Sequence, residues 1–369
     1  MKMHYSHLGG LKRHAMDRDI IEVFNGEIYI VISSSHPRDR VVSYLKYIPS
    51  KEKGSSIWFK DGMWYHRILK HYGAKYLSKI IKEYKIDDFL VYDDYLGITL
   101  IEIPISQVKV HYLPEERAKE IIKEPKDKLE MTAREIILSL SEKTDVPIDN
   151  IGITGSILLK MHNLRYSDID LLVYGYNNAF KIRRHLLKLL EEGEFFKRLH
   201  GWLLEKYVEE LTKTYPLDRF EALRICEETW SRGVFRNKFF SIHPVLYPSE
   251  NIIKYGDQRY KGICLLKIKA RVVDDRYSMF MPAIYRVSNV KLLSGCKFTE
   301  VNKISEVVSY EAVYSDIARV GEDILVYGKL EKVEDLNTGN IHYRVLVGSY
   351  EANGMDYIKP LRWYSEENI

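Results

Sequence analysis

The sequence has little cysteine: three residues in 369, at Cys226, Cys264 and Cys296. They lie far apart and include no C-x-x-C pair, so we expect neither a zinc site nor a disulfide framework, and a reducing compartment fits best. Long apolar runs are also missing, since none approaches the roughly 18–20 residues of a membrane-spanning helix. No secretory signal is visible. These absences predict a cytoplasmic protein that does not associate with membranes.

Several catalytic motifs are absent as well. The sequence contains no G-x-x-x-x-G-K-S/T, G-x-G-x-x-G or H-E-x-x-H, which removes the main support for a kinase, a P-loop ATPase, a dinucleotide oxidoreductase or a zinc protease. The formal net charge of +4 permits a nucleic-acid partner without demanding one. Hydrophobic residues at 46% and charged residues at 29% indicate packed cores. Abundant Lys and Glu are a tendency of thermophile proteins.

The patterns that are present divide the chain into three zones and predict an α+β fold class. Residues 1–112 combine strands, including a hairpin signal at Asn25-Gly26, with a helical stretch at Tyr76–Tyr84. Residues 113–256 alternate helices with strands, as an α/β domain does. Residues 257–369 show short strands separated by turn signals, which predict an all-β, barrel-like domain.

The central zone has clear element boundaries. Pro114 suits the start of a helix, and Asp127 suits the cap of the next one. A short strand then leads to a turn at Gly155-Ser156 and a short helix. Further strands are expected at Asp168–Val173 and Phe239–Tyr247.

The segment from Gly155 to Asp170 carries the chemistry. Alternation along a strand points Asp168 and Asp170 to the same face, where two carboxylates make a hard-oxygen site for Mg²⁺ or Mn²⁺. Gly155 allows a tight turn close to a phosphate. Ser156 offers a hydroxyl at the start of a helix, where free N–H groups favour an anion. The spacing therefore brings a metal and a nucleotide phosphate together.

This pattern, Gly-Ser followed after eleven residues by Asp-Ile-Asp-Leu-Leu-Val, resembles the signature of the DNA polymerase β-like nucleotidyltransferase superfamily. The layout of the whole chain is also similar to uncharacterised archaeal proteins predicted to be nucleotidyltransferases. The resemblance implies that 113–256 is a nucleotidyltransferase domain. It also implies that Ser156 binds nucleotide phosphates and that Asp168 and Asp170 hold the metal ions and act in catalysis.

The sequence departs from the superfamily pattern at one position. A third carboxylate usually lies on the next core strand, but Phe239–Tyr247 contains no Asp or Glu and has His243 instead. His243 could bind a metal or accept a proton, or it could be a structural histidine. Asp274 and Asp275, after the next strand, are the alternative carboxylates.

Basic residues supply candidate contacts to nucleotide or RNA. Lys181 and Arg184 share one face of a predicted helix and are candidate nucleotide-binding residues, although a solvated face is the usual reason for such a pattern. Aromatic and basic residues alternate at Trp64–Arg67, a mixture that can stack bases and hold phosphates. The basic segment Ser231–Lys238 could reach a triphosphate or an acceptor, or be a solvated loop.

Two functions of different class follow. The first is a metal-dependent nucleotidyltransferase that uses Mg²⁺ or Mn²⁺ to move an NMP from an NTP to an acceptor hydroxyl on RNA or another macromolecule. The alternative is a catalytically inactive protein of the same fold that acts as a nucleotide- or RNA-binding module. The missing third carboxylate is the feature that keeps the alternative open.

Overall fold

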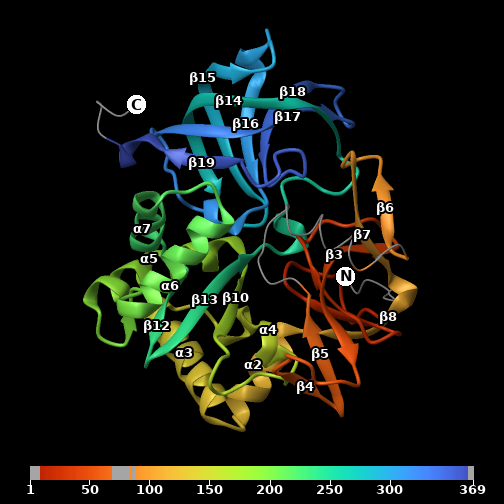
Figure 1. Cartoon of the computed structure of the whole chain (residues 1–369), viewed down its shortest axis with the longest axis vertical. Coiled ribbons are helices and arrows are strands. Elements are labelled where there is room, and N and C mark those ends of the chain that lie inside the picture. The colour runs from red at the N-terminus through yellow and green to blue at the C-terminus, as the bar shows by residue number, and fades with distance from the viewer. Residues whose placement is uncertain (1–8, 69–83, 85–87, 365–369) are drawn as a thin grey trace. The chain divides into compact units, whose positions relative to one another are not determined.

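The computed structural model describes residues 9–68, 84 and 88–364 (Figure 1). The chain forms two compact units, and each unit is assembled from three separate segments. The first unit takes residues 1–70, 101–199 and 230–252, and the second takes residues 71–100, 200–229 and 253–369. Helices and sheets occur together, so the predicted α+β class is confirmed.

An antiparallel half-barrel sheet occupies the N-terminal part of the first unit. Its strands follow the order β4-β5-β3-β2-β1-β8, and β7 pairs with β3. The Asn25-Gly26 turn joins β1 to β2 as predicted, with Gly26 at a φ of 87° that glycine adopts readily. The helix expected at Tyr76–Tyr84 lies outside the described residues apart from Tyr84. The strands are β1 (Ile20–Val23), β2 (Ile28–Val31), β3 (Arg40–Ser50), β4 (Trp58–Lys60), β5 (Met63–Arg67), β7 (Ile98–Pro104) and β8 (Val108–Tyr112).

A mixed sheet with helices forms the rest of the first unit. Its strand order is β11-β12-β13-β10-β9, with β10 parallel to β13 and antiparallel to β9. The strands are β9 (Ile151–Ile153), β10 (Ile169–Tyr174), β11 (Phe196–Lys197), β12 (Arg232–Phe235) and β13 (Lys238–Val245). The helices are α2 (Pro114–Lys123), α3 (Lys128–Thr144), α4 (Gly155–Leu158) and α5 (Tyr176–Glu192).

The helix starts agree with the capping signals in the sequence. Pro114 is the first residue of α2, where its missing N–H costs no hydrogen bond. Asp127 caps α3 by accepting hydrogen bonds from the backbone N–H groups of Leu129 and Glu130. Such a cap contributes about 1 kcal/mol.

Helix α4 packs against the half-barrel sheet. Leu158, Leu159 and Met161 share one buried cluster with Tyr47 of β3 and Tyr65 of β5. Burying side chains of this size stabilises the arrangement by about 1.5–3 kcal/mol each. Packing against strands of the half-barrel sheet therefore helps to fix the position of the turn at which α4 begins.

The second unit is mostly β-sheet. Strand β14 pairs with β15 and with β17, and the pairs β15–β16, β16–β18 and β18–β17 complete a closed ring of hydrogen-bonded strands. Side chains of helices α6 and α7, including Val208 and Ile225, share a core with Ile268 and Val326 of the sheet. The elements are β6 (Leu90–Asp93), α6 (Gly201–Thr214), α7 (Arg219–Glu228), β14 (Gln258–Tyr277), β15 (Ala283–Gly295), β16 (Ile304–Ser309), β17 (Asp323–Asp335), β18 (Ile341–Val347) and β19 (Tyr357–Pro360).

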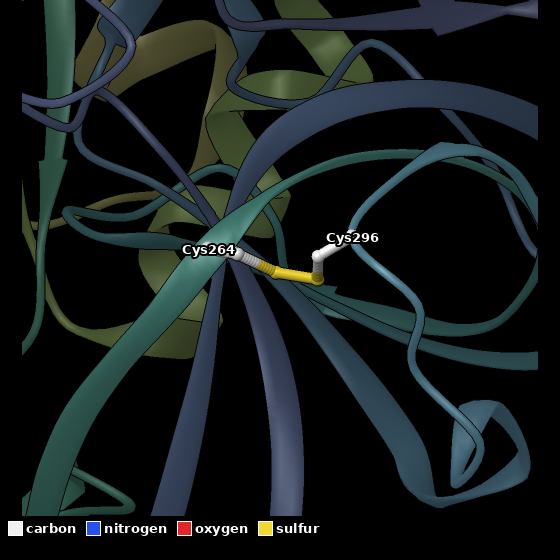
Figure 2. The surroundings of a disulfide bond; sticks show 2 residues. All are labelled: Cys264 and Cys296. Atoms are coloured by element: carbon white, nitrogen blue, oxygen red, sulfur yellow. A yellow bond between two sulfur atoms is a disulfide. The ribbon is translucent and has the colours of Figure 1, made fainter.

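A disulfide joins Cys264 of β14 to Cys296, which directly follows β15 (Figure 2). The expectation of no disulfide is therefore wrong. The two cysteines are 32 residues apart, and no local motif links them. The antiparallel register, which sets Leu266 opposite Gly295, brings their Cα atoms to 6.4 Å. Cys226 is a buried free thiol.

Candidate functional site

The two predicted metal-binding carboxylates lie at the N-terminal end of β10. Asp168 immediately precedes the strand and is exposed, whereas Asp170 is its second residue, with a side chain 25% exposed. Leu172 and Tyr174 share the face of Asp170 by strand alternation, and both are buried. Asp170 is thus held on a rigid strand whose neighbouring residues pack in the core.

Gly155 lets the backbone approach Asp170 closely. A Cβ atom at position 155 would lie 2.5 Å from Asp170 Oδ2, closer than real Cβ contacts allow. Gly155 also has a φ of 67°, which side-chain-bearing residues rarely adopt. The backbone N–H of Thr154 donates to the Asp170 carbonyl at 2.9 Å, which locks the turn to the strand. The predicted juxtaposition of the glycine turn and the carboxylate is present.

Ser156 is 7% exposed, and its hydroxyl lies inside the unit. Its Oγ is 3.2 Å from Ser167 Oγ, which also accepts a hydrogen bond from the backbone N–H of Asn163 at 2.9 Å. These bonds brace the loop that leads to Asp168. The Ser156 hydroxyl therefore already has a hydrogen-bond partner within the protein, whereas the sequence predicts that it binds a nucleotide phosphate.

Strand β13 supplies two polar side chains next to Asp170. In the parallel register, Ser241 pairs with Asp170 and His243 pairs with Leu172. The Ser241 hydroxyl donates to Asp170 Oδ1 at 2.5 Å, and His243 Nε2 lies 2.9 Å from the same Ser241 oxygen. Because the single hydroxyl proton is used toward Asp170, Nε2 carries the imidazole proton and Nδ1 is left as the basic nitrogen. Sequence reasoning missed Ser241, although it shares a strand face with His243.

The electrostatics separate the two carboxyls. Burial, followed by the charge of Asp170, raises the pKa of Asp168 to about 7 even though part of its side chain is exposed. Burial also opposes ionisation of Asp170, but His243 and the Ser241 hydrogen bond outweigh it and hold the pKa of Asp170 below its usual value. Burial, followed by the charge of Arg18, lowers the pKa of His243 to about 4. The imidazole is therefore neutral near pH 7.

These residues fit a divalent metal ion. Repulsion from Asp170 helps to retain a proton on Asp168 near neutral pH, and a cation between the two carboxylates would relieve that repulsion. Carboxylate oxygens are the hard ligands that Mg²⁺ and Mn²⁺ prefer. The donor set therefore suits either ion, with Asp168 and Asp170 as ligands.

Basic side chains from other parts of the unit act on the same groups. Lys46 of β3 and Arg67 of β5 favour the ionised form of Asp168, and both belong to the half-barrel sheet. Their charges would also attract an anionic substrate. The basic residues whose charges influence the carboxyls or His243 are Arg18, Lys46, Arg67 and Arg232.

Helix α5 packs on the opposite face of the central sheet. Atoms of Leu190 and Phe240 both lie 3.0 Å from the position that a Cβ at Gly233 would occupy, so this helix meets the sheet on the Phe240 side. Phe240 and Ser241 are consecutive on β13 and point to opposite faces. The face that carries Ser241 and Asp170 is therefore not the one that α5 covers.

The structure does not bring Lys181 and Arg184 together with the carboxylates. Both lie on α5, where Arg184 is exposed and Lys181 Nζ donates to the Asp145 carbonyl at 3.1 Å. The alternative acids, Asp274 and Asp275, lie on β14 in the second unit, where Asp274 accepts hydrogen bonds from Arg276. Ser241 and His243 are thus the polar side chains that β13 places beside Asp170.

A second cluster of two carboxylates and a histidine lies at the start of α3. We name Asp127, Glu130 and His162 the cap cluster, and their potential ligand atoms lie within 4.8 Å of one another. His162 Nε2 lies 2.7 Å from Asp127 Oδ2, while Glu130 pairs with Arg117 and accepts from the backbone N–H of Lys126. Within the described part of the chain, His162 Nδ1 has no hydrogen-bond partner.

To distinguish the two sites, we name Asp168, Asp170 and His243 the acid-pair site.

Comparison with known proteins identifies a family. The chain is an α+β protein in which an acid pair and a glycine turn face one another. The chain is 32% identical to the uncharacterized protein MJ1086 of the archaeon Methanocaldococcus jannaschii over 353 residues. The aligned region covers 93% of this chain and 98% of that protein. The chain belongs to the same family as that protein. No family model and no solved structure matches this chain.

None of the helices in the described residues combines the length and apolar character needed to cross a bilayer.

Proposed function

We propose that the chain is a metal-dependent nucleotidyltransferase that moves an NMP from an NTP to an acceptor hydroxyl on RNA or another macromolecule. The observation that carries the proposal is the acid pair beside the Gly155 turn, where a single added methyl group would collide with Asp170. Two carboxylates with a purely structural role would be more stable if they lay farther apart or each had a positively charged partner. Here the Gly155 backbone instead comes so close to the Asp170 carboxylate that no side chain would fit between them. Burial and the charge of Asp170 raise the pKa of Asp168 to about 7.

The residues have distinct roles in this mechanism. Asp168 and Asp170 would hold Mg²⁺ or Mn²⁺, which would supply charge stabilisation for the phosphates and the leaving pyrophosphate. The acceptor oxygen bonds to the α-phosphorus while the bond from that phosphorus to the pyrophosphate oxygen breaks. His243 is neutral and can take the acceptor proton at Nδ1, because its Nε2 proton is directed to Ser241. Ser241 links the imidazole to Asp170 and fixes its orientation.

A second candidate function rests on two observations. Strand β13 has no carboxylate at the position next to Asp170, and the Ser156 hydroxyl is bonded to Ser167. Both are compatible with a protein that binds nucleotide or RNA without turnover. In that case the binding of RNA persists when Asp168 is replaced.

The test is incubation of purified full-length wild type with each α-³²P NTP, Mg²⁺ or Mn²⁺, and total RNA or cell protein. We expect label on the acceptor with the wild type and a loss on the order of a hundredfold or more in Asp168→Asn and Asp170→Asn, since each removes a metal ligand. Asp127→Asn is the matched control, because it changes the same residue type in the cap cluster and should keep activity.

The outcomes separate the two candidates. Equal labelling by wild type and Asp170→Asn would rule out this site as the source of transfer. No label with any acceptor, together with NTP or RNA binding by the wild type, would support the binding module. Loss of transfer in Asp127→Asn in protein that remains folded would show that the cap cluster also matters for catalysis.

A further inference from the structure

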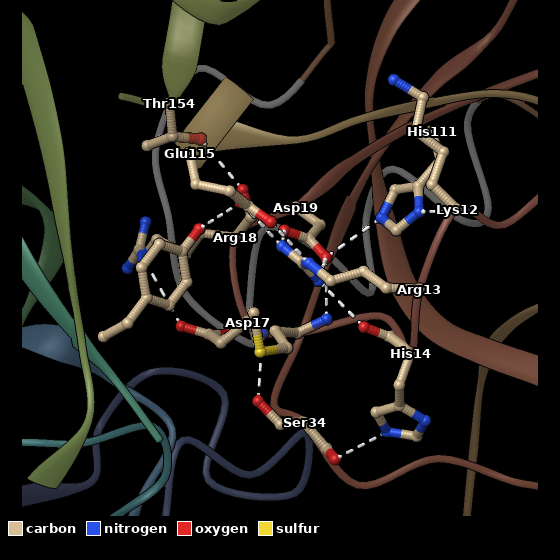
Figure 3. A network of polar contacts seen from close by, with 12 residues as sticks. Lys12, Arg13, His14, Asp17, Arg18, Asp19, Ser34, His111, Glu115 and Thr154 are labelled. Carbon is tan, nitrogen blue, oxygen red and sulfur yellow. Dashed lines mark hydrogen bonds and ion pairs between the residues drawn. The ribbon is translucent and has the colours of Figure 1, made fainter. Parts of the chain in front are cut away.

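Charged side chains near the start of the first unit are paired with one another. The Arg13 guanidinium binds both carboxylate oxygens of Asp19, at 2.6 and 2.8 Å, and both of Glu115, at 2.7 and 2.9 Å (Figure 3). His111 Nε2 lies 3.0 Å from Asp19, and the Tyr174 hydroxyl donates to Glu115 at 3.0 Å. The guanidinium and the carboxylates compensate one another. On one strand face of the second unit, by contrast, cations outnumber the acids that pair with them.

Strand β14 carries three cations on the outer face of the ring of strands. Lys267, Lys269 and Arg271 are alternate residues of β14, and the residues between them, Ile268 and Ala270, are buried in the core. The three cationic side chains therefore point away from the core. The side chain of Arg271 is 50% exposed and that of Lys269 is 36% exposed. Because a strand rises about 3.3 Å per residue, the cations follow one another at about 6.6 Å, which is comparable to the separation of successive phosphates in an extended single strand.

Strand β15 adds a fourth cation at an unfavourable position. Lys291 is exposed and lies directly opposite Lys269 in the antiparallel register, where two like charges destabilise a sheet. Asp323 pairs with Lys269 at 3.2 Å and with Arg271 at 2.7 Å. Among the residues that the structure describes, Lys267 and Lys291 form no ion pair. Four cations and one acid leave a formal excess of three positive charges on this face.

Strand β17 places an aromatic ring beside these cations. Tyr327 lies directly opposite Lys267 in the antiparallel register of β14 and β17, so the two side chains share one face of the sheet. The Tyr327 ring is half-buried, and its centroid lies 6.1 Å from that of Tyr357 on β19. A row of cations next to an aromatic ring suits a single-stranded nucleic acid, because each nucleotide offers a phosphate and a base that can stack.

We propose that single-stranded RNA binds to the basic face, which we define as Lys267, Lys269, Arg271, Lys291 and Tyr327. The four cations contact successive phosphates, and Tyr327 stacks on a base. The phosphates supply the negative charge that relieves the repulsion between Lys269 and Lys291. An acidic peptide would satisfy the cations but would leave the aromatic ring unused. The choice of RNA among single strands rests on the proposed function, in which RNA is an acceptor.

The probe is a fluorescein-labelled oligouridine of about twelve nucleotides, titrated with the full-length protein in EDTA and followed by fluorescence anisotropy. We expect Lys267→Gln/Lys269→Gln/Lys291→Gln to weaken binding by about tenfold to a hundredfold. This triple variant should also reduce the slope of log K against log salt concentration by about 2, at roughly 0.7 for each lost phosphate contact. Tyr327→Ala should weaken binding by about tenfold without changing the salt slope, and Tyr327→Phe should bind as wild type does, because it keeps the stacking face.

The matched control removes three exposed lysines that already have acidic partners. Lys119→Gln/Lys126→Gln/Lys213→Gln changes the net charge by the same amount and should bind as wild type does. Because the basic-face triple variant removes a like-charge pair, its melting temperature should stay near that of wild type. Lys267→Gln/Lys291→Gln changes only the two lysines without an ion pair, so it serves if the triple variant does not fold.

The results distinguish this inference from the proposed function. RNA binding that depends on the basic face and persists in Asp170→Asn, without any NMP transfer, would support the inference and remove the transfer function. Transfer by wild type, with oligouridine affinity unchanged in the basic-face triple variant, would overturn the inference and leave the function standing. Wild type that does not bind oligouridine, or an equal loss of affinity in the triple variant and its matched control, would also overturn it. Polyglutamate binding as tight as that of oligouridine, with the same dependence on the basic face, would overturn RNA as the ligand and indicate an acidic protein.

Discussion

The cap cluster and the acid-pair site have the same composition, two carboxylates and one histidine. They differ in how the carboxylate charges are compensated. In the cap cluster, every carboxylate has a dedicated donor: backbone N–H groups and His162 for Asp127, and Arg117 and the Lys126 N–H for Glu130. In the acid-pair site, burial and Asp170 raise the pKa of Asp168. The first arrangement compensates both of its carboxylates without a ligand, whereas in the second the charge of Asp168 stays unfavourable until a cation binds.

The sharpest way to break this comparison is to remove one carboxylate charge from each cluster. Glu130→Gln removes the buried carboxylate partner of Arg117 and leaves the half-exposed Glu120 as its remaining ion-pair partner, so it should lower the free energy of unfolding by about 3 kcal/mol. Asp168→Asn relieves repulsion and should raise the stability of the metal-free protein at pH 8. Chemical denaturation of both variants and of wild type measures whether each substitution lowers or raises the free energy of unfolding. Destabilisation by Asp168→Asn would mean that its charge is already compensated in the folded protein.

Metal addition gives the next largest effect. If Mg²⁺ binds the folded acid-pair site alone, a concentration a hundred times the dissociation constant adds about 2.7 kcal/mol to wild-type stability. The gain should persist in Asp127→Asn and vanish in Asp170→Asn, as read from melting temperatures with Mg²⁺ and with EDTA. A gain that vanishes in Asp127→Asn instead would move the metal site to the cap cluster.

The smallest expected effect is a pH dependence of stability that belongs to Asp168. Its folded-state pKa is about 7 against an ordinary 3.8, so the folded chain binds more protons than the unfolded chain between these values. Ionisation of Asp168 therefore opposes folding increasingly as the pH rises through this range. Without metal, wild type should lose stability relative to Asp168→Asn between pH 5 and pH 8, by a small amount because the side chain is partly exposed to screening solvent. Parallel melting-temperature profiles for the two proteins would contradict this.

Local signals in the sequence predicted the parts of the structure that depend on near neighbours. The Pro114 start of α2, the Asp127 cap of α3 and the Asn25-Gly26 hairpin are confirmed, because a cap or a tight turn is decided within a few residues. The turn at Gly155 and the acid strand also lie where the motif spacing puts them. The ring of strands in the second unit agrees with the expected β-rich character.

Contacts between distant segments could not be read from the sequence. The disulfide depends on the register of a long hairpin, and the proximity of Ser241 to Asp170 depends on a parallel pairing. The hydrogen bond from the Thr154 hydroxyl to the Arg18 carbonyl joins residues 136 positions apart, and no motif marks Arg18. The helical spacing of Lys181 and Arg184 identified a common face but not the side of the sheet that this helix covers.

The interleaved order of the two units has a consequence for synthesis on the ribosome. Asp170 emerges 71 residues before Ser241, its partner on β13, and the intervening chain includes residues 200–229 of the second unit. A nascent chain that ends after α5 therefore exposes an edge of β10, the kind of unpaired strand edge that other chains can join. Because domains fold as whole units during synthesis, the strand that completes the acid-pair site is the last of its sheet to become available. Premature termination anywhere before residue 238 would leave Asp170 without its neighbours Ser241 and His243.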